Sequence, residues 1–465
     1  MSESISEMIL PGTYIEVRSE GLISVGSIAT GNIGIVGTAA RGPRNVAVPI
    51  GSYSDALDAF GPYDPASNAN ALTLTRALEL AYQGGAQSVY AVRIANGDPT
   101  AASVAVRAAG DTDGFTIAAV DAGTWGNQIR YSLVNQGTGA QPNWQLALTY
   151  RNIKETYQAA NVGVMATALA ASRLVKVTGA VSNPTSGFGT VDPAAPLAGG
   201  NDQPAVSPAD LGAGLAALES QPVNILLVAG FSAANARGPV AAHLERTENE
   251  AHERIAILGA RSSASADVLT DAASIASPRI VLAAPGVVST DAATGQPVTL
   301  PPSYLAAVVG GTLSTLAPQV SLTNRQLPVD ALDLSYNSTV TKNLLQNRVL
   351  AVREKFGFQV VKGITTDPGA FTQITVRRIV DYAKAGVRSG ADPYLGRLNN
   401  ARVRAALRAT LDGFLSQMVL DEMLVGYQLD VSATRAQEIA GVAQVLLTLQ
   451  PTFSIDFIRV TMVLQ

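Results

Sequence analysis

The sequence contains no cysteine, only two histidines and few charged residues. The lack of cysteine excludes disulfides, thiolate zinc sites and cysteine nucleophiles. Charged residues make up 15% of the chain and hydrophobic residues 47%. This composition indicates a folded protein, and it is expected where much of the surface is buried against other copies of the chain. The net charge of −4 provides no basic surface, so we expect no binding to nucleic acid.

Long hydrophobic runs are also missing. The longest apolar stretches, Val223–Phe231 and Tyr304–Val309, are shorter than the ~20 residues that a membrane span needs. The opening MSESISEMILPGTY has glutamates but no basic residue, which argues against a signal peptide. We therefore expect a soluble protein, made in a cytoplasm and without membrane insertion. Its 465 residues predict two to four domains.

No motif for catalysis or cofactor binding stands out. Gly31, Gly34 and Gly37 have the spacing G-x-x-G-x-x-G rather than that of a dinucleotide-binding loop, so a strand punctuated by glycines fits better. His243 and His252 are nine residues apart, which does not place them on one helical face for a metal. We interpret both as residues of a solvated helix surface. No catalytic residue, metal site or cofactor is expected.

Strand patterns alternate with helix patterns in residues 21–99 and 199–344. A helix is predicted over Leu74–Tyr82, where the apolar residues share one face and Gly84 follows. Buried strands are predicted within Gly31–Pro43, Ala86–Ile94, Val223–Gly230, Arg254–Ala260 and Arg279–Val287. The order indicates βαβ units, so we expect the two segments to be halves of one α/β middle domain.

Residues 100–198 show a different pattern. Short alternating segments are separated by Gly, Asn and Pro turns, as in Phe115–Val120, Asn127–Asn135 and Trp144–Tyr150. Trp125 and Trp144 are expected in a core or at an interface. This segment is predicted to be a β-rich domain inserted between the two α/β halves.

The last part, residues 345–465, is predicted to be a further domain built on a long helix. Apolar residues recur there at helical spacing, as Val403, Leu407, Leu411, Phe414 and Met418. Arg402, Arg404 and Arg408 lie off this stripe, on a face that either is hydrated or binds a partner. Strands are then predicted over Val442–Leu449 and Ser454–Leu464.

Strand patterns occur at both ends of the chain. At the N-terminus, Ile15 and Val17 alternate with polar neighbours, and the final segment alternates in the same way. A strand at a chain end exposes a free edge unless another strand pairs with it. The residues that we expect to pair between subunits are Tyr14, Ile15, Glu16, Val17, Arg18, Ile455, Phe457, Ile458, Val460, Met462 and Leu464.

Several stretches resemble the tail sheath family of contractile bacteriophages and related injection systems. In chain order they are Pro11–Val17, Ser27–Pro43, Phe60–Asp64, Gly84–Ile94, Thr124–Leu133, Pro196–Leu218, Thr375–Val387, the helix from Arg402, and Pro451–Leu464. Each is weakly specific, and their fixed order carries the resemblance. The region around Leu300–Gly311 keeps the family's Pro-Pro-Ser start. It departs from the family because it lacks the aspartate-rich, tryptophan-containing continuation common in relatives.

The resemblance implies a structural subunit that is not an enzyme. Copies would polymerise helically around a tail tube, linked by exchanged arms at residues 1–20 and at the C-terminus, and contraction would drive the tube through a target cell envelope. Implied partners are further copies of the chain and the tube, baseplate and tail terminator proteins of a virion assembled in the host bacterial cytoplasm. The implied fold is multidomain, of mixed α/β and α+β class, with inner α/β domains and an outward β-rich insertion.

In this family the C-terminal part faces the tube, so Arg402, Arg404 and Arg408 are candidates to contact it. Two alternatives stay open. One is an α/β enzyme with a β-rich accessory domain, which would elute as a small defined species rather than form tubules. The other is the sheath of a non-viral injection system, which the neighbouring genes would distinguish.

Overall fold

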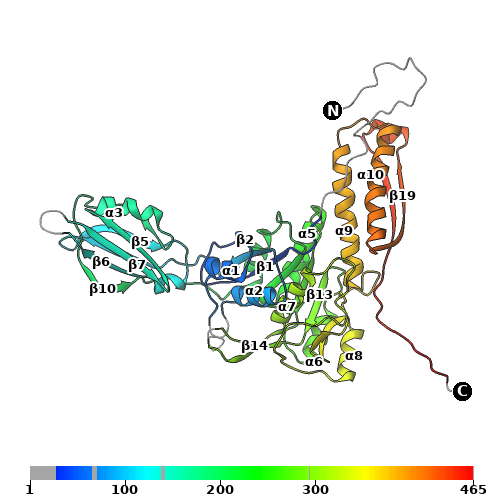
Figure 1. The fold of residues 1–465 in the computed structure, drawn as a ribbon, viewed down its shortest axis with the longest axis horizontal. Helices are drawn as coiled ribbons and strands as arrows, with labels where there is room; N and C mark the ends of the chain where they lie inside the picture. The colour runs from blue at the N-terminus through cyan, green and yellow to red at the C-terminus, as the bar shows by residue number, and fades with distance from the viewer. Residues whose placement is uncertain (1–27, 65–70, 138–141, 293, 464–465) are drawn as a thin grey trace, which may run out of the picture.

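The structure is a computed structural model that describes residues 28–64, 71–137, 142–292 and 294–463 (Figure 1). The molecule is elongated, with a β-rich part at one end, an α/β part in the middle and a pair of long helices beside a hairpin at the other end. The predicted mixed α/β, multidomain fold class is confirmed. Within the described ranges, no helix has both the length and the apolar character needed to cross a membrane.

An eight-stranded sheet forms the middle part, in the order β18-β17-β13-β12-β11-β1-β3-β2. Its strands are β1 (Ile33–Thr38), β2 (Ala47–Ile50), β3 (Val89–Ile94), β11 (Ile225–Ser232), β12 (Ile255–Gly259), β13 (Ile280–Ala284), β17 (Val349–Glu354) and β18 (Phe358–Val360). The six inner strands are parallel, and both edge strands are antiparallel to their neighbours. β1 lies between β3 and β11, so the segments before and after residues 100–198 share one sheet.

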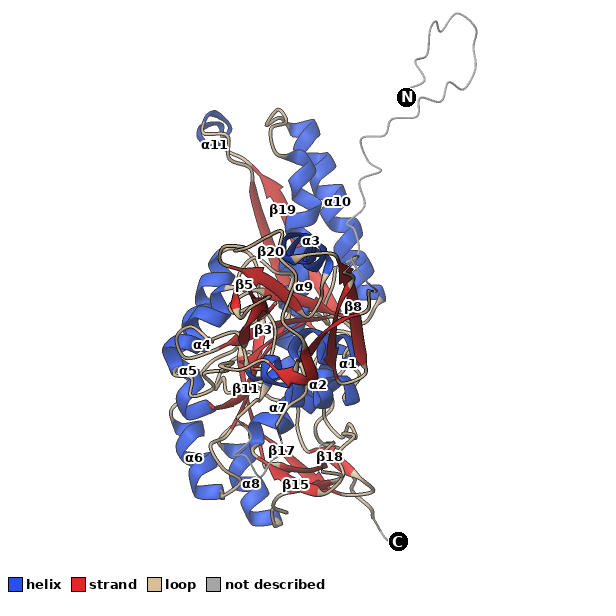
Figure 2. Ribbon diagram, turned by 90° about the vertical axis from the view of Figure 1, so that its left-hand side faces the viewer, coloured by secondary structure: helices blue, strands red, loops and turns tan. Residues whose placement is uncertain are grey.

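Helices cover both faces of this sheet, as parallel strands require. One face is packed by α4 (Pro208–Ala216), α5 (Ala233–Asn249), α6 (Ser265–Ala273) and α8 (Ser338–Gln346), and Figure 2 shows α4, α5 and α6 along one side. The other face is packed by α1 (Tyr53–Phe60), α2 (Leu74–Gln83) and α7 (Pro302–Ser314). α7 is buried along nearly its whole length, and a Cβ at Gly311 would lie 2.1 Å from the Ala81 carbonyl oxygen of α2.

The predicted strands and the helix from Leu74 are present in this part. The departing segment after residue 300 forms α7, α8 and a small sheet of β14 (Val287–Thr290), β15 (Pro297–Leu300) and β16 (Ala331–Leu332). One predicted boundary differs from the structure. The sequence places the start of the C-terminal part at residue 345, but β17 pairs with β13 and β18 pairs with β17, so the central sheet continues to Val360.

Residues 100–198 form two antiparallel sheets, of order β10-β6-β7-β8 and β4-β5-β9. Their elements are β4 (Ser103–Ala108), β5 (Thr112–Ala119), η3 (Thr124–Gln128), β6 (Arg130–Asn135), β7 (Trp144–Tyr150), β8 (Ile153–Ala159), α3 (Val162–Ala168), η4 (Leu169–Ala171), β9 (Val175–Thr178) and β10 (Val191–Pro196). Trp125 and Trp144 are both buried in a core that belongs almost entirely to this segment.

A buried arginine joins this β-rich part to the central sheet. Arg93, the fifth residue of β3, is fully buried and donates to the carbonyl oxygens of Ala122 (2.7 Å) and Gly42 (2.9 Å). Its Nη2 lies 3.4 Å from Oδ1 of Asp202. Burial lowers the pKa of Arg93, and the nearby Asp202 carboxyl partly offsets that effect. Arg93 thus ties the β-rich segment, at Ala122, and the turn that follows it, at Asp202, to one point of the sheet.

Candidate assembly surface

The C-terminal part is built on two long helices, α9 (Ile374–Ala391) and α10 (Ala401–Leu420), joined through η5 (Asp392–Tyr394). They approach closely where a Cβ at Gly386 would lie 1.9 Å from the ring of Phe414. The predicted apolar stripe of α10 is present, since Leu407, Leu411 and Met418 are buried in the core of this part, while Val403 and Phe414 are half-buried. Asn400 begins the helix by accepting a hydrogen bond from the Val403 N–H at 2.9 Å.

A two-stranded antiparallel sheet packs on these helices. It consists of β19 (Leu424–Ser432) and β20 (Gln444–Pro451), connected through α11 (Arg435–Ile439). The inward face carries the pairs Tyr427–Leu449, Leu429–Leu447 and Val431–Val445, whereas the pairs of the outward face are mainly polar. Among the described residues no third strand joins this sheet, so each of its two strands has an unpaired edge. Such edges are templates for pairing with another chain.

Beyond β20 the chain runs on as an extended tail, Thr452–Val463. The strand predicted over Ser454–Leu464 is not present within the single chain, because the described part of the chain supplies no neighbouring strand for it. The predicted side chains of this tail are strongly exposed: Ile455 (78%), Phe457 (85%), Ile458 (82%), Val460 (71%) and Met462 (85%). Leu464 and the N-terminal residues Tyr14, Ile15, Glu16, Val17 and Arg18 lie outside the described residues.

The structure separates the three predicted arginines of α10. Arg404 Nη1 donates to Oε1 of Glu438 at 2.9 Å, so its charge is paired within the chain. Arg408 is exposed and contacts no acidic group in the described ranges. Arg402, also exposed, lines a shallow pocket beside Tyr394 and Arg397. The two exposed arginines lie at the surface of α10, whereas Arg404 fastens α11 to the start of that helix.

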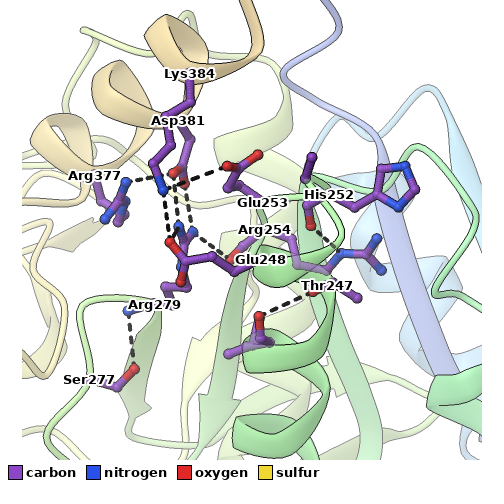
Figure 3. Close-up of polar contacts among 12 residues, drawn as sticks. Thr247, Glu248, His252, Glu253, Arg254, Ser277, Arg279, Arg377, Asp381 and Lys384 are labelled. Carbon is purple, nitrogen blue, oxygen red and sulfur yellow. Dashed lines mark hydrogen bonds and ion pairs between the residues drawn. The ribbon is translucent and has the colours of Figure 1, made fainter. Parts of the chain in front are cut away.

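A network of ion pairs connects α9 to the central sheet (Figure 3). Its centre is Arg279, just before β13, which is 4% exposed. The Arg279 guanidinium donates to Glu248 at 2.8 and 2.6 Å and to Asp381 at 2.8 and 3.0 Å. Glu248 is at the end of α5 and Asp381 is on α9, so Arg279 is held between carboxylates from two parts of the molecule.

Three further cations of α9 extend this network. Arg377 donates to Asp381 at 2.6 Å, Lys384 Nζ lies 2.9 Å from Glu248 Oε1, and Arg388 pairs with Glu253. Hydrogen bonds from Arg279 lower the pKa of Glu248 to about 2, against the opposing effect of burial, and Lys384 adds to the lowering. Burial lowers the pKa of Arg377. Burial also acts to lower the pKa of Arg279, but its carboxylate partners Glu248 and Asp381 outweigh that effect, so the pKa of Arg279 is raised.

His243 corrects one prediction. We expected it on a solvated helix surface, but it is fully buried on α5, and its Nε2 lies 3.1 Å from Nη1 of Arg254. Because an arginine only donates, Nε2 accepts and the imidazole is neutral. Burial, with the nearby Arg254 and Arg246 charges, lowers the pKa of His243 to about 3. His252 follows the helix and is exposed, as expected.

A cavity of about 210 Å³ lies beside the network, between the segment before β1, the start of β11 and α9. Its ionisable lining residues include Glu253, Asp381 and Arg378, and all three are already bonded to protein groups. In the described ranges no group of three or more His, Asp or Glu is placed to hold a metal ion. The arrangement is therefore suited to holding parts of the chain together.

The ion-pair network was not predicted from the sequence, although a signal exists. Arg377, Asp381, Lys384 and Arg388 follow one another at spacings of four, three and four. This spacing places the charged residues along one face of α9, just as apolar residues at the same spacing form a buried stripe on other helices. A charged stripe on a long helix therefore indicates a polar contact with another part of the fold.

Comparisons with known proteins agree with this architecture. Residues 366–465 match the family model of the phage tail sheath C-terminal domain. No curated protein sequence matches the chain. Among solved structures, the sheath tail protein of Desulfitobacterium hafniense is similar with a TM-score of 0.67 and 18% identity, over 95% of this chain and 100% of that chain.

Two further structures have the same fold. The sheath tail protein of Listeria innocua has a TM-score of 0.66 and 15% identity, over 93% of this chain and 98% of that chain. The helical sheath of the anti-feeding prophage, in its contracted state, has a TM-score of 0.57 and 15% identity, over 98% of this chain and 99% of that chain. Residues 366–465 thus match the phage tail sheath C-terminal domain, and the chain has the fold of tail sheath proteins.

Proposed function

We propose that this chain is the structural, non-catalytic subunit of a contractile tail sheath, which polymerises helically around a tail tube and is linked by exchanged terminal strands. The observation that carries the proposal is that two features occur together on one chain. Within the described ranges, the β19–β20 hairpin has two unpaired edges. In the same ranges the extended tail, Thr452–Val463, has exposed apolar side chains and no strand beside it. A second copy of the chain would supply the missing strand in each case: its tail would pair with a hairpin edge, and its hairpin edge would pair with the tail.

Strand exchange satisfies both features. The hairpin already packs on α9 and α10, and a third and a fourth strand would pair its two edges and extend the sheet. A tail from one neighbour adds to one hairpin edge, with its N–H and C=O groups bonding to that edge. The N-terminal arm, residues 1–20 with Tyr14–Arg18 at its centre, is proposed to add to the other edge.

The energy of one exchanged arm is modest. Pairing of about six residues, at ~0.5–1.5 kcal/mol net for each hydrogen bond, contributes a few kcal/mol. Ile458, Val460 and Met462 add to this if the pairing removes them from water, at ~1.5–3 kcal/mol for each fully buried side chain. Repeated over a helical lattice, these links hold a sheath together while the individual bodies move.

Contraction follows from that combination of flexible links and rigid bodies. The extended sheath is a kinetically trapped state that converts into a more tightly packed one and drives the tube through a target cell envelope. The proposed partners are copies of this chain and the tube, baseplate and tail terminator proteins. The particle is a virion or a related injection system, and a phage sheath is assembled in the host bacterial cytoplasm.

The domains are proposed to have fixed places in the sheath. The part that carries α9, α10 and the hairpin faces the tube, the central sheet forms the body, and residues 100–198 project outward. In Figure 1 the β-rich part and the hairpin lie at opposite ends of the molecule, which supports this placement.

Removal of either arm tests the proposal. Chains lacking Met1–Glu20 or Phe453–Gln465 are expected to stay folded, with a native circular dichroism spectrum, but to form no long tubules in electron micrographs. The full-length chain assembled under the same conditions is the control. If both truncated chains form normal long sheaths, the proposed strand exchange is wrong.

A further inference from the structure

The start of the tail is attached to its own subunit on one side only. Thr452, Ser454 and Asp456 are half-buried, whereas Phe453 and Ile455 are 63% and 78% exposed. Successive residues of an extended chain point in opposite directions. The polar side of this segment therefore faces the body of the subunit, and the apolar side faces outward.

Gln373 holds the polar side. Its Oε1 accepts the Ser454 N–H at 3.0 Å, and its Nε2 donates to the Ser454 carbonyl oxygen at 3.3 Å and to Asp456 Oδ2 at 3.0 Å. One side-chain amide thus bonds both backbone groups of Ser454, as a residue of a neighbouring strand would. Lys362 adds an ion pair, with its Nζ 3.1 Å from Asp456 Oδ2.

Both anchoring residues are on a well-fixed segment between β18 and α9. Ile364 and Gln373 form a β-bridge, and Thr366 Oγ1 lies 3.1 Å from the Ser277 carbonyl oxygen next to the central sheet. Asp456 is 12% exposed in its side chain although its neighbour Phe457 is 85% exposed. The tail is therefore fastened to the body of the subunit, away from the hairpin from which it emerges.

α9 holds the other end of the described chain as well. Arg378, 7% exposed, donates to the carbonyl oxygens of Leu316 (2.8 Å), Thr30 (3.2 Å) and Ala317 (3.3 Å). Thr30 lies just before β1, where the N-terminal segment enters the body. Gln373, directly before α9, and Arg378, near the start of that helix, therefore hold the first residues of the tail and the segment before β1.

We propose that Gln373 and Lys362 are positioning residues that hold the tail at Ser454 and Asp456 and so select which neighbouring copy receives it. The proposal rests on the strand exchange proposed above. With the tail held at Asp456, the free residues Phe457–Gln465 reach at most about 30 Å, whereas a tail released back to Pro451 has the free residues Thr452–Gln465 and reaches about 50 Å. A held tail reaches one adjoining copy in one direction, and a released tail reaches several.

The nearly isosteric substitution Gln373→Glu tests the anchor without a cavity. It keeps an acceptor for the Ser454 N–H but removes the donor and places a carboxylate against Asp456. The double substitution Gln373→Glu with Asp456→Asn supplies a donor from the tail instead, and is expected to restore the attachment. Lys362→Ala removes the ion pair with Asp456, and Lys355→Ala, at an exposed lysine of the β17–β18 turn, is its matched control.

The chain has no cysteine, so two spin labels can be placed at Lys355→Cys and Val460→Cys. In the unassembled subunit we expect a distance distribution limited by the four residues Phe457–Val460 that follow Asp456. Gln373→Glu is expected to broaden it about twofold, because the nine residues Thr452–Val460 are then free. In electron micrographs, the unsubstituted chain and Lys355→Ala are expected to form tubules of one helical lattice. Gln373→Glu and Lys362→Ala are expected to form mixed lattices, and the double substitution to restore a single one.

Two results would overturn the anchor: an unchanged distance distribution in Gln373→Glu, or a single native lattice despite a broadened distribution. Failure of the underlying strand exchange has a different signature. In that case a chain lacking Phe453–Gln465 still assembles into regular tubules, whatever residue 373 is.

Discussion

Asp381 of α9 accepts two hydrogen bonds from Arg279, from Nη1 to Oδ2 at 2.8 Å and from Nη2 to Oδ1 at 3.0 Å. The side chains are 15% and 5% exposed, so the pair is shielded from water. Arg279 precedes a strand of the central sheet, and Asp381 belongs to the C-terminal part, within the residues that match the tail sheath family model. This pair therefore joins the domain to the body of the subunit.

Removal of Asp381 is expected to weaken that joint. Asp381→Ala removes a carboxylate that balances the buried positive charges of Arg279 and Arg377. We therefore expect the free energy of unfolding to fall by about 3 kcal/mol. Urea denaturation measures the change. Arg435→Ala is the control, because Arg435 is 83% exposed and its pair with Glu438 is expected to contribute less than ~1 kcal/mol. Equal effects of the two substitutions would contradict the assigned role of Asp381.

His243 predicts a pH dependence of stability. Its pKa is lowered from 6.5 to about 3 in the folded chain, so below pH 6.5 the unfolded chain takes up a proton that the folded chain does not. The contribution of neutral His243 to the free energy of unfolding is fully present above pH 6.5 and is lost as the pH falls toward 3. The free energy of unfolding is expected to fall by ~2 kcal/mol by about pH 5.

The substitution His243→Gln removes the titrating group and keeps an acceptor for Arg254. Urea unfolding of this variant is expected to depend less on pH between 6.5 and 5 than that of the unsubstituted chain. Glu245→Gln, at an exposed position of the same helix, serves as the control. Identical pH profiles for all three chains would show that His243 is not the group responsible.

Residues 100–198 are expected to be removable. The two ends of the segment are adjacent, since Thr100 and Asn201 form a β-bridge and the Asn96 N–H donates to the Gln203 carbonyl at 2.8 Å. A short Gly-Ser linker therefore spans the gap. We expect the remaining chain to fold and assemble, with a loss of ~1–3 kcal/mol because Arg93 no longer bonds to Ala122. Thermal unfolding and electron microscopy measure both properties, and an unfolded product would contradict the separate core of this segment.

The proposed contact with the tube concerns Arg402 and Arg408. Glutamate at both positions is expected to leave tube-free assembly intact and to abolish assembly of the extended sheath on a tube, since many weak charge pairs of ~0–1 kcal/mol would each become repulsive. Arg404→Glu tests a different property, because Arg404 is paired with Glu438 and its reversal detaches α11. Unchanged assembly on the tube would remove Arg402 and Arg408 from the interface. Cosedimentation of sheath with tube is the measurement.

Much of the architecture follows from local patterns. β1 and β3 are largely apolar and lie close to glycines, and α10 has an apolar stripe, so periodicity and turn residues are sufficient to predict them. β17 was assigned to the wrong part because pairing of distant strands is not a local property. Nothing near Val349 indicates that it lies beside β13.

The candidate site was predicted less completely. The exposed tail was expected from its terminal position, but its attachment to Gln373 depends on residues about 80 positions apart and has no periodic signal. The burial of His243 depends on a contact that is only partly local. Its partner Arg254 follows the helix that carries it, and a polar helix face is buried there by a neighbouring loop.

The position of β1 between β3 and β11 also has a consequence for biosynthesis. β1 and β3 leave the ribosome early, but the strand on their other side, β11, is not complete until Ser232 has been translated. Residues 100–198 emerge in between and make mostly local antiparallel contacts, which form quickly. We therefore expect residues 100–198 of the nascent chain to fold first, while β1 remains unpaired on its β11 side until the rest of the sheet has been translated.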